Sequence, residues 1–240
     1  MVAAKTLQYE VNKLLGRINT SYESDINAVD LDAYINNAKD LVLSRVDKLV
    51  EKNRIFQRDF ADLLEIDKVL KLKNSDNKLY NIYSLPKDYY DYTRLSGFIK
   101  LNNCEVKLET LLYVQQDDLN EALKDPNIKP SWGWRSGIYY FKSDKELIFY
   151  HDNEYDVSKI LISYIKYLND IATPSNANGE YIKSDGITVV KEDKGLDLRK
   201  ENILWRKIVQ IAAYLIHKDL DKNFKPEIDS IIFNDKLGII

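Results

Sequence analysis

The chain has 240 residues, with 35 basic and 38 acidic side chains and a formal net charge of −3 at pH 7. This balance excludes a general attraction to nucleic acid or to an anionic membrane, so any contact with DNA is expected to be local or passive. The single cysteine, Cys104, excludes an intrachain disulfide and a thiolate metal cluster. The longest apolar runs are far shorter than the ~20 residues that span a bilayer, and the first residues show no signal-peptide pattern. We therefore expect a protein that is made and used in water.

Two helices are predicted in the first third of the chain. Residues 4–19 have apolar side chains at spacings of three and four, which indicates one buried helical stripe. A polar loop is expected at Thr20–Asn27, followed by Asp30 as the cap of a longer helix. The helical spacing runs from Leu31 to Leu49 and resumes between Phe56 and Leu64.

The middle of the chain is predicted to be rich in strands. Twelve of the seventeen tyrosines fall between residues 79 and 167, among β-branched residues and short turn signals. The candidate strands are Leu79–Tyr83, Tyr89–Lys100, Cys104–Tyr113, Gly137–Phe141, Glu146–His151 and Val157–Tyr167. A short helix at Asp117–Leu123 is expected to end before Pro126. Residues 159–167 also fit a helical face, but their β-branched residues and tyrosines favour a strand.

The last part of the chain returns to helix. A short strand is expected at Ile187–Val190, and a helix after Gly195 has one face formed by Leu204, Ile208, Ile211 and Leu215. These elements predict an α+β fold, in which a helical bundle from the N- and C-terminal parts holds an inserted antiparallel β region. The expected divisions are N-terminal helices at 1–75, a β-rich insertion at 76–192, a C-terminal bundle helix at 193–221 and an extended C-terminal tail at 222–240.

The usual enzymatic motifs are missing from the sequence. The eight glycines are scattered, so no Gly-rich phosphate loop is formed. His151 and His217 are far apart and lie in neither a metal-binding helix pair nor a serine elbow. Cys104 precedes Glu105, a negative neighbour that raises a thiol pKa and disfavours a nucleophilic thiolate. We therefore expect no catalytic, cofactor-binding or metal-binding residues, and no enzymatic activity.

One cluster of acids leaves a hydrolytic alternative open. Its members surround two predicted strands, and paired carboxylates are the groups that cleave glycosidic bonds. The cluster contains Asp144, Glu146, Asp152, Glu154 and Asp156. A solvated sheet edge explains the same residues, because charges at strand ends discourage uncontrolled edge pairing.

Two of the three tryptophans, Trp132 and Trp134, lie in the run 129–135 between Lys129 and Arg135. Aromatic and basic residues that alternate can form a platform for nucleic acid. Large aromatic side chains beside Pro and Gly also fix a loop to its own domain or to a partner protein. Two basic residues offer too few phosphate contacts for useful DNA affinity, so packing within the domain or at a protein interface is expected.

Short motifs in a fixed order give the chain a family resemblance. They are Leu85-Pro86-Lys87-Asp88-Tyr89-Tyr90, Asp125-Pro126, Lys129-Pro130-Ser131-Trp132 and Ile162-Ser163-Tyr164-Ile165-Lys166, flanked by Ile35-Asn36-Asn37-Ala38 and Ile208–Leu215. Over residues 5–220 the chain resembles the head-to-tail adaptor, or ring, proteins beneath the portal of tailed phages, of the crAss-like and related short-tailed type.

The resemblance implies a structural virion protein of the tail or neck region, made in the host bacterial cytoplasm. Such a subunit forms a dodecameric ring below the portal, joins capsid to tail and lines the DNA conduit during DNA ejection. Its partners would be its own copies, the portal protein and further tail or ring proteins. Double-stranded DNA would pass without sequence-specific binding, and neither a cofactor nor a membrane is implied.

The residues expected at partner interfaces are aromatic, basic and aliphatic. They are Trp132, Trp134, Arg135, Ile231, Ile232, Phe233, Leu237, Ile239 and Ile240. The last six give the C-terminal tail too much apolar surface to remain in solvent, so we expect the tail to dock on the portal. The alternative function is a monomeric or dimeric binding module that uses the Trp132/Trp134 loop, and a glycan hydrolase is the second alternative.

Overall fold

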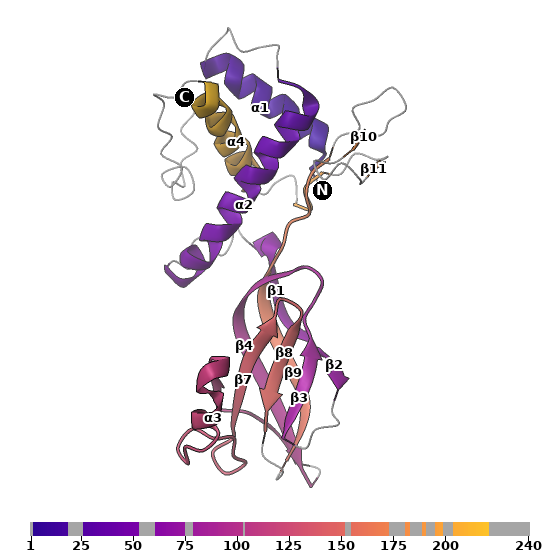
Figure 1. Ribbon diagram of the computed structural model, residues 1–240. Coiled ribbons are helices and arrows are strands. Elements are labelled where there is room, and N and C mark those ends of the chain that lie inside the picture. The colour runs from indigo at the N-terminus through magenta and orange to yellow at the C-terminus, as the bar shows by residue number, and fades with distance from the viewer. Residues whose placement is uncertain are drawn as a thin grey trace. The chain divides into compact units, whose positions relative to one another are not determined.

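The computed structural model describes residues 2–18, 26–52, 61–74, 79–102, 104–151, 155–172, 181–182, 189–190, 195–198 and 204–220. Its α-helices are α1 (Ala4–Ile18), α2 (Ala28–Lys52), α3 (Leu119–Ala122) and α4 (Leu204–Leu220), and two short 3₁₀ turns are η2 (Ala61–Leu63) and η3 (Gln116–Asp118). The chain divides into two compact units (Figure 1): Met1–Asp62 with Leu168–Ile240, called the helical unit here, and Leu63–Tyr167, called the β unit.

Most strands belong to the β unit, where they form two curled sheets. The strands are β1 (Leu64–Val69), β2 (Lys71–Asn74), β3 (Tyr80–Ser84), β4 (Tyr89–Leu101), β5 (Cys104–Lys107), β6 (Thr110–Tyr113), β7 (Ser136–Ser143), β8 (Glu146–Tyr150) and β9 (Asp156–Lys166). One sheet has the order β1-β9-β4-β5 and the other the order β2-β3-β8-β7-β6. β10 (Tyr181–Ile182) and β11 (Val189–Val190) form a separate pair in the helical unit.

The helical unit is held by one apolar stripe on each of α1, α2 and α4. Its fully buried side chains include Leu7, Val11, Leu15, Leu31, Ile35, Ala38, Val42, Leu204, Ile208, Ile211 and Ala212. These positions follow the three- and four-residue spacing of the sequence, so the predicted helices are confirmed here. Each large aliphatic side chain buried in this way contributes about 1.5–3 kcal/mol.

Helix α2 begins one turn earlier than expected. The side chain of Asn27 accepts a hydrogen bond from the backbone N–H of Asp30 at 2.9 Å and donates one to the Asp30 carboxylate at 2.8 Å. Asn27 is therefore the N-terminal cap, and Asp30 lies at the third helical position, where a carboxylate interacts favourably with the helix dipole.

The β unit has an apolar core between its two sheets. Both sheets supply buried side chains to it: Tyr83, Ile99, Tyr139, Leu147, Phe149, Ile160, Ile162 and Tyr164. A second cluster covers the other face of the five-stranded sheet, where α3 packs Leu119 and Ala122 against Ile138, Tyr140 and Ile148. The five-stranded sheet thus has apolar side chains on both faces.

Strand β7 lies inside this sheet, between β8 and β6. It pairs in antiparallel fashion with β8 and in parallel fashion with β6. In the parallel pair, Thr110 lies opposite Ser136 and Tyr113 lies opposite Tyr139. A Cβ at Gly137 would lie 2.4 Å from the ring of Phe149, so a residue without a side chain is required there.

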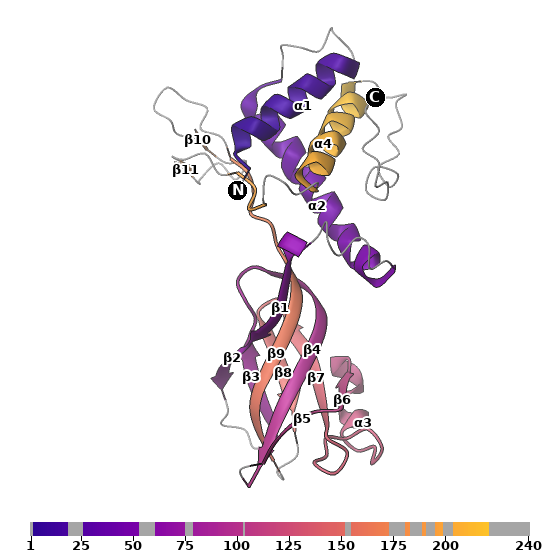
Figure 2. The same cartoon turned by 180° about the vertical axis from the view of Figure 1, so that it is seen from behind.

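One predicted strand is divided into two, β5 and β6, in the structure. Residues 104–113 were expected to be continuous, but β5 ends one sheet and β6 ends the other (Figure 2). The ladder changes partner at this point, because Leu108 N–H donates to the Gly97 carbonyl at 2.8 Å and Glu109 N–H to the Arg135 carbonyl at 2.9 Å.

The expected fold class is wrong. The described chain is mainly β, with two curled sheets and four short helices, instead of a helical bundle that holds an inserted antiparallel β region. One reason is that Leu63 and Leu64 fit helical spacing, yet Leu64 begins β1, and β2 follows where no strand was expected. The parallel pairing of β6 with β7 also departs from a purely antiparallel arrangement.

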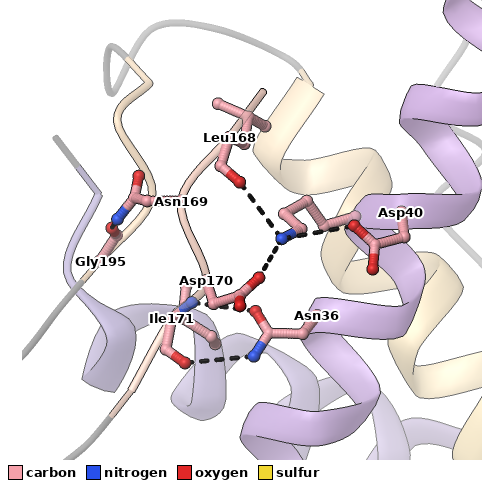
Figure 3. Close-up of polar contacts among 8 residues, drawn as sticks. Asn36, Asp40, Leu168, Asn169, Asp170, Ile171 and Gly195 are labelled. Carbon is pink, nitrogen blue, oxygen red and sulfur yellow. Dashed lines mark hydrogen bonds and ion pairs between the residues drawn. The ribbon is translucent and has the colours of Figure 1, made fainter. Parts of the chain in front are cut away.

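A buried ammonium group fixes the segment that enters the helical unit after Leu168. The Lys39 side chain on α2 is fully buried and donates hydrogen bonds to the Leu168 carbonyl at 3.2 Å and to the Asp170 carboxylate (Figure 3). The Asp40 carboxylate lies 3.4 Å from the same ammonium. Because an uncompensated buried charge is costly, these partners are needed for Lys39 to occupy this position.

The side chain of Asn36 binds the same segment through two hydrogen bonds. It accepts from the backbone N–H of Ile171 at 2.9 Å and donates to the Ile171 carbonyl at 3.2 Å (Figure 3). The Asn36 amide therefore provides hydrogen bonds to both the N–H and the carbonyl of Ile171, as a neighbouring strand would. Asn36 and Lys39, one helical turn apart on α2, hold this segment in place together.

We predict that Asp170→Ala lowers the free energy of unfolding by about 1.5–3 kcal/mol, since it removes a charge-assisted hydrogen bond from a buried cation. Urea unfolding followed by circular dichroism at 222 nm measures this change. Asp197→Ala, at an exposed position of the same unit, is the matched control and should change stability by less than about 0.5 kcal/mol. Equal effects of the two variants would contradict the role given to Lys39.

Candidate protein interface

The tryptophan loop, residues 131–136, has a closed and well-defined backbone. Ser131 and Ser136 exchange backbone hydrogen bonds of 3.2 and 3.0 Å, and Arg135 N–H donates to the Trp132 carbonyl at 3.0 Å. The Ser136 hydroxyl also donates to the Lys129 carbonyl at 3.2 Å. Arg135 has a φ of 46°, a left-handed conformation that a turn of this kind requires. The loop is therefore a tight turn whose position is fixed by the start of β7.

The two tryptophans of this loop point to different environments. Trp132 is half-buried and packs against the inter-sheet core, with its ring 6.3 Å from that of the buried Tyr155. Tyr155 in turn donates a hydrogen bond from its hydroxyl to the Ser136 carbonyl at 2.9 Å. Trp134 is 75% exposed, the largest exposed fraction among the large apolar side chains of the described residues. One tryptophan thus fixes the loop, and the other is presented to solvent.

Arg135 lies beside Trp134 and is also exposed. Its guanidinium forms an ion pair with Glu109 at 2.8 Å, and both side chains are about half exposed or more. Arg135 lines one side of a groove of about 740 Å³ that also contains Arg94 and Lys107. Surface ion pairs of this kind contribute little to stability, so the guanidinium remains able to bind another carboxylate.

A second surface feature, called the aromatic groove here, lies at the other end of β7. It has a volume of about 410 Å³ and is lined by Tyr89, Tyr90, Asp91, Tyr92, Tyr113, Phe141, Ser143 and Asp144. These residues come from β4, β6 and the end of β7 with the turn that follows it. The groove therefore lies where β4 of one sheet packs beside β6 and β7 of the other.

Phe141 is the centre of the aromatic contacts in this groove. Its ring lies 4.9 Å from that of Tyr92, 6.0 Å from that of Tyr89 and 6.3 Å from that of Tyr113. Tilted and offset pairs at these distances are attractive, and they hold the rings in fixed orientations. Tyr113 is 47% exposed, so the aromatic surface is open to a ligand.

The electrostatic character of the aromatic groove is neutral to negative. Burial raises the pKa of Tyr89, so its phenol stays protonated at neutral pH. Asp91 and Asp144 are the charged residues of the lining, and both are acids. The Asp91 carboxylate accepts the backbone N–H of Tyr92 at 2.8 Å. The groove therefore suits aromatic and cationic groups and disfavours phosphate and other anions.

Sequence reasoning missed the aromatic groove because its members are spread over three strands. The signal that could have found it was the concentration of tyrosines between residues 79 and 167. That concentration was read only as a sign of β structure. Tyr113 and Phe141 are on the paired strands β6 and β7, and Tyr89 meets them because the two sheets pack together, which the sequence did not specify.

The candidate hydrolytic acids do not form a paired-carboxylate site among the residues that can be placed. Glu146 accepts a hydrogen bond from Lys73, which holds the pKa of its carboxyl below the usual value, a shift that disfavours a general acid. Asp144 lies in the aromatic groove, and Asp156 is exposed at the start of β9. Asp152 and Glu154 lie outside the described residues.

The remaining candidates from the sequence are dispersed. His151 lies in the β unit with its ring 5.9 Å from Tyr155, whereas His217 is on α4. Cys104 is exposed at the start of β5. Within the described ranges no group of three or more His, Cys, Asp or Glu side chains could hold a metal ion. No helix among the same residues has the length and apolarity needed to cross a membrane.

The expected tail contacts cannot be placed. Ile231, Ile232, Phe233, Leu237, Ile239 and Ile240 all lie outside the described residues, as does the rest of 221–240. Of the residues predicted to contact partners, the structure therefore places Trp132, Trp134 and Arg135, and it brings these three together in one loop.

No protein-family model matches this chain, and no curated protein matches it.

The different positions of the two tryptophans predict different mutational effects. We expect Trp132→Ala to lower the free energy of unfolding of the β unit by about 2–4 kcal/mol, since it removes a large side chain packed against the core. Trp134→Ala should change it by no more than about 0.5 kcal/mol. Urea titrations of both variants, followed by circular dichroism, test this. A strong destabilisation by Trp134→Ala would mean that Trp134 supports the fold and is not available to a partner.

Proposed function

We propose that this protein is a structural, non-enzymatic subunit of a multi-subunit assembly: the head-to-tail adaptor of a tailed phage. In this proposal its copies form a ring below the portal, join the capsid to the tail and surround the passing DNA. The order of the sequence motifs supports the identity of the assembly. The observation that supports an interface function is the exposure of Trp134 on a fixed loop.

Exposed tryptophan on a rigid turn is a costly feature for a protein that works alone. A large apolar side chain in water loses the free energy that burial would provide, and tryptophan is among the residues that contribute most to interfaces. The turn that presents Trp134 is held by four backbone and side-chain hydrogen bonds and by Trp132 beneath it. Little conformational entropy is then lost when a partner covers Trp134, which favours binding.

Other exposed apolar residues of the β unit support the same proposal. Ile66, Val69 and Leu72 are 71%, 58% and 52% exposed, and they lie on the consecutive edge strands β1 and β2. Exposed sheet edges pair readily with other chains unless they are protected. The charged neighbours Lys68, Lys71 and Lys73 are protection of that kind, so we place the main interface at the tryptophan loop.

A binding module that acts as a monomer or dimer is the second candidate, because the aromatic groove could accept a ligand without any ring. The mass of the assembly in solution distinguishes the ring-forming adaptor from the monomeric or dimeric binding module. We predict that the purified chain, alone or mixed with the portal protein of the same phage, forms closed rings of about twelve copies, as the family resemblance implies. Native mass spectrometry gives the number of copies, and negative-stain electron microscopy shows whether the ring is closed.

The mass measurement has a clear negative result. If the chain remains a monomer or dimer at all accessible concentrations, and also when mixed with portal protein, the ring proposal is wrong and the binding module is favoured. Tyr9→Ala is a useful control variant, since Tyr9 is 64% exposed on α1, outside the β unit, and its removal should leave ring formation unchanged.

The C-terminal residues 223–240 provide a separate prediction about the portal. Their apolar side chains are expected to dock there, so deletion of 223–240 should abolish binding to the portal and leave the helix content of the subunit unchanged. Co-purification with tagged portal protein and far-ultraviolet circular dichroism measure the two quantities. Normal incorporation of the truncated chain would show that this segment is not a docking element.

A further inference from the structure

We propose that Trp134 and Arg135 of one copy insert into the aromatic groove of the next copy, so that the β units associate head to tail. This inference depends on the proposed function, because it names the contact by which the ring would form. It assigns a binding role to the groove formed by Tyr89, Tyr92, Tyr113 and Phe141.

The first argument comes from the position of the two surfaces. The tryptophan loop ends at Ser136, the first residue of β7, and Phe141, Ser143 and Asp144 of the groove lie near the end of β7 and just after it. A strand rises about 3.3 Å per residue, so along β7 Ser136 lies roughly 17 Å from Phe141 and roughly 23 Å from Ser143. The loop is held at the start of β7 by its backbone hydrogen bonds, so a single chain does not place its own Trp134 against its own Phe141.

The second argument comes from symmetry. Two different surfaces that bind each other make a heterologous contact, and after the first contact one copy still has a free groove and the other a free loop. Such contacts continue until they close into a ring, or they produce an open filament if the rotation between copies does not close. An isologous dimer, in contrast, would need the loop and the groove of each copy at one interface, with each loop in the partner's groove. The separation of loop and groove thus fits the ring better than it fits a dimer.

The third argument is chemical complementarity. The groove is lined by five aromatic rings, three of which contact Phe141, and an indole can pack on them edge to face or offset. Its carboxylates, Asp91 and Asp144, match the positive charge of Arg135, and planar guanidinium groups bind carboxylates and aromatic faces together. Arg135 only has to exchange an exposed partner, Glu109, for a new one.

The charges of the two grooves also differ. Three basic residues, Arg94, Lys107 and Arg135, and one acid, Glu109, line the groove beside the loop, whereas the charged residues of the aromatic groove are the acids Asp91 and Asp144. The acidic lining of the aromatic groove disfavours nucleic acid and anionic lipid. A second copy of this chain supplies both an aromatic and a cationic group, which suit this lining. The loop and the aromatic rings are each held in fixed positions, so little ordering is required on contact.

A disulfide trap tests the contact directly. In a Cys104→Ser background, Gly133→Cys places a thiol beside Trp134 and Ser143→Cys places one in the groove, so both contact groups are retained. Gly133 tolerates a side chain, because the nearest atom to an added Cβ is the Ser131 hydroxyl at 3.7 Å. A disulfide requires Cα atoms within about 7 Å, so the two cysteines cannot join within one copy. We expect oxidation to give a ladder of covalent oligomers up to the size of the ring.

The controls for the trap use the same chain. Neither single-cysteine protein should give a ladder, because each copy then has only one thiol and stops at a dimer. Adding Trp134→Ala to the double-cysteine protein should suppress the ladder, and in the native background Trp134→Ala should weaken subunit association roughly 30-fold, as removal of a central interface tryptophan does.

A charge reversal tests the role of Arg135 independently. Asp144→Lys should weaken association, whereas Asp117→Lys, the same charge change at an exposed position outside the groove, should not. Arg135→Glu together with Asp144→Lys should restore part of the lost association. Sedimentation velocity across a range of protein concentrations measures each variant.

The outcomes separate this inference from the proposed function. If the native chain forms rings but the double-cysteine protein gives no ladder, and Trp134→Ala and Asp144→Lys associate as the native chain does, the ring proposal stands and the loop-in-groove contact is wrong. If the native chain forms no oligomer with or without portal protein, the ring proposal itself fails. A ladder that depends on Trp134 supports both.

Discussion

Strand β7 is fixed in one register because apolar side chains cover both of its faces. Ile138 and Tyr140 face the cluster formed with α3, while Tyr139 packs in the core between the two sheets. A shift of one residue would exchange these two sets and disrupt both clusters. Gly137 adds a further constraint, since the ring of Phe149 occupies the space that a side chain would need. This register determines where the tryptophan loop begins and where Phe141 reaches the surface.

Much of the local structure could be predicted from the sequence. The three- and four-residue spacing of Leu7, Val11 and Leu15 predicted α1, and the same rule predicted α4. The β-branched residues and tyrosines at 157–167 predicted a strand over a competing helical pattern, and β9 confirms it. Such predictions succeed because the pattern and the local structure both depend on residues that are close together in the sequence.

The wrong predictions concern contacts between distant residues. Leu63 and Leu64 satisfied a helical pattern, but pairing with β9 makes Leu64 part of β1. The single strand predicted at 104–113 is divided, because each half finds its partner in a different sheet. With strands in place of helix and an unforeseen parallel pair, the fold class expected from the sequence was wrong. Strand pairing is decided by long-range packing, which one sequence does not reveal.

The candidate interface was also predictable only where it depends on residues that are close together in the sequence. The sequence identified Trp132, Trp134 and Arg135 from their composition, but not which tryptophan supports the fold and which faces solvent. The aromatic groove could not be predicted, because Tyr92, Tyr113 and Phe141 come together only through the sheets. The structure thus distinguishes the two tryptophans by their environments and shows an aromatic groove that includes the end of β7.

The central claim is that this chain acts through contacts between its copies in a particle. Electron cryo-microscopy of purified phage particles that contain the chain tests this claim most directly, because it places every copy in its assembly. The account predicts a closed ring of this protein between portal and tail, with Trp134 of each copy buried against its neighbour. A particle without this chain at the neck, or a ring in which Trp134 faces solvent, would contradict it.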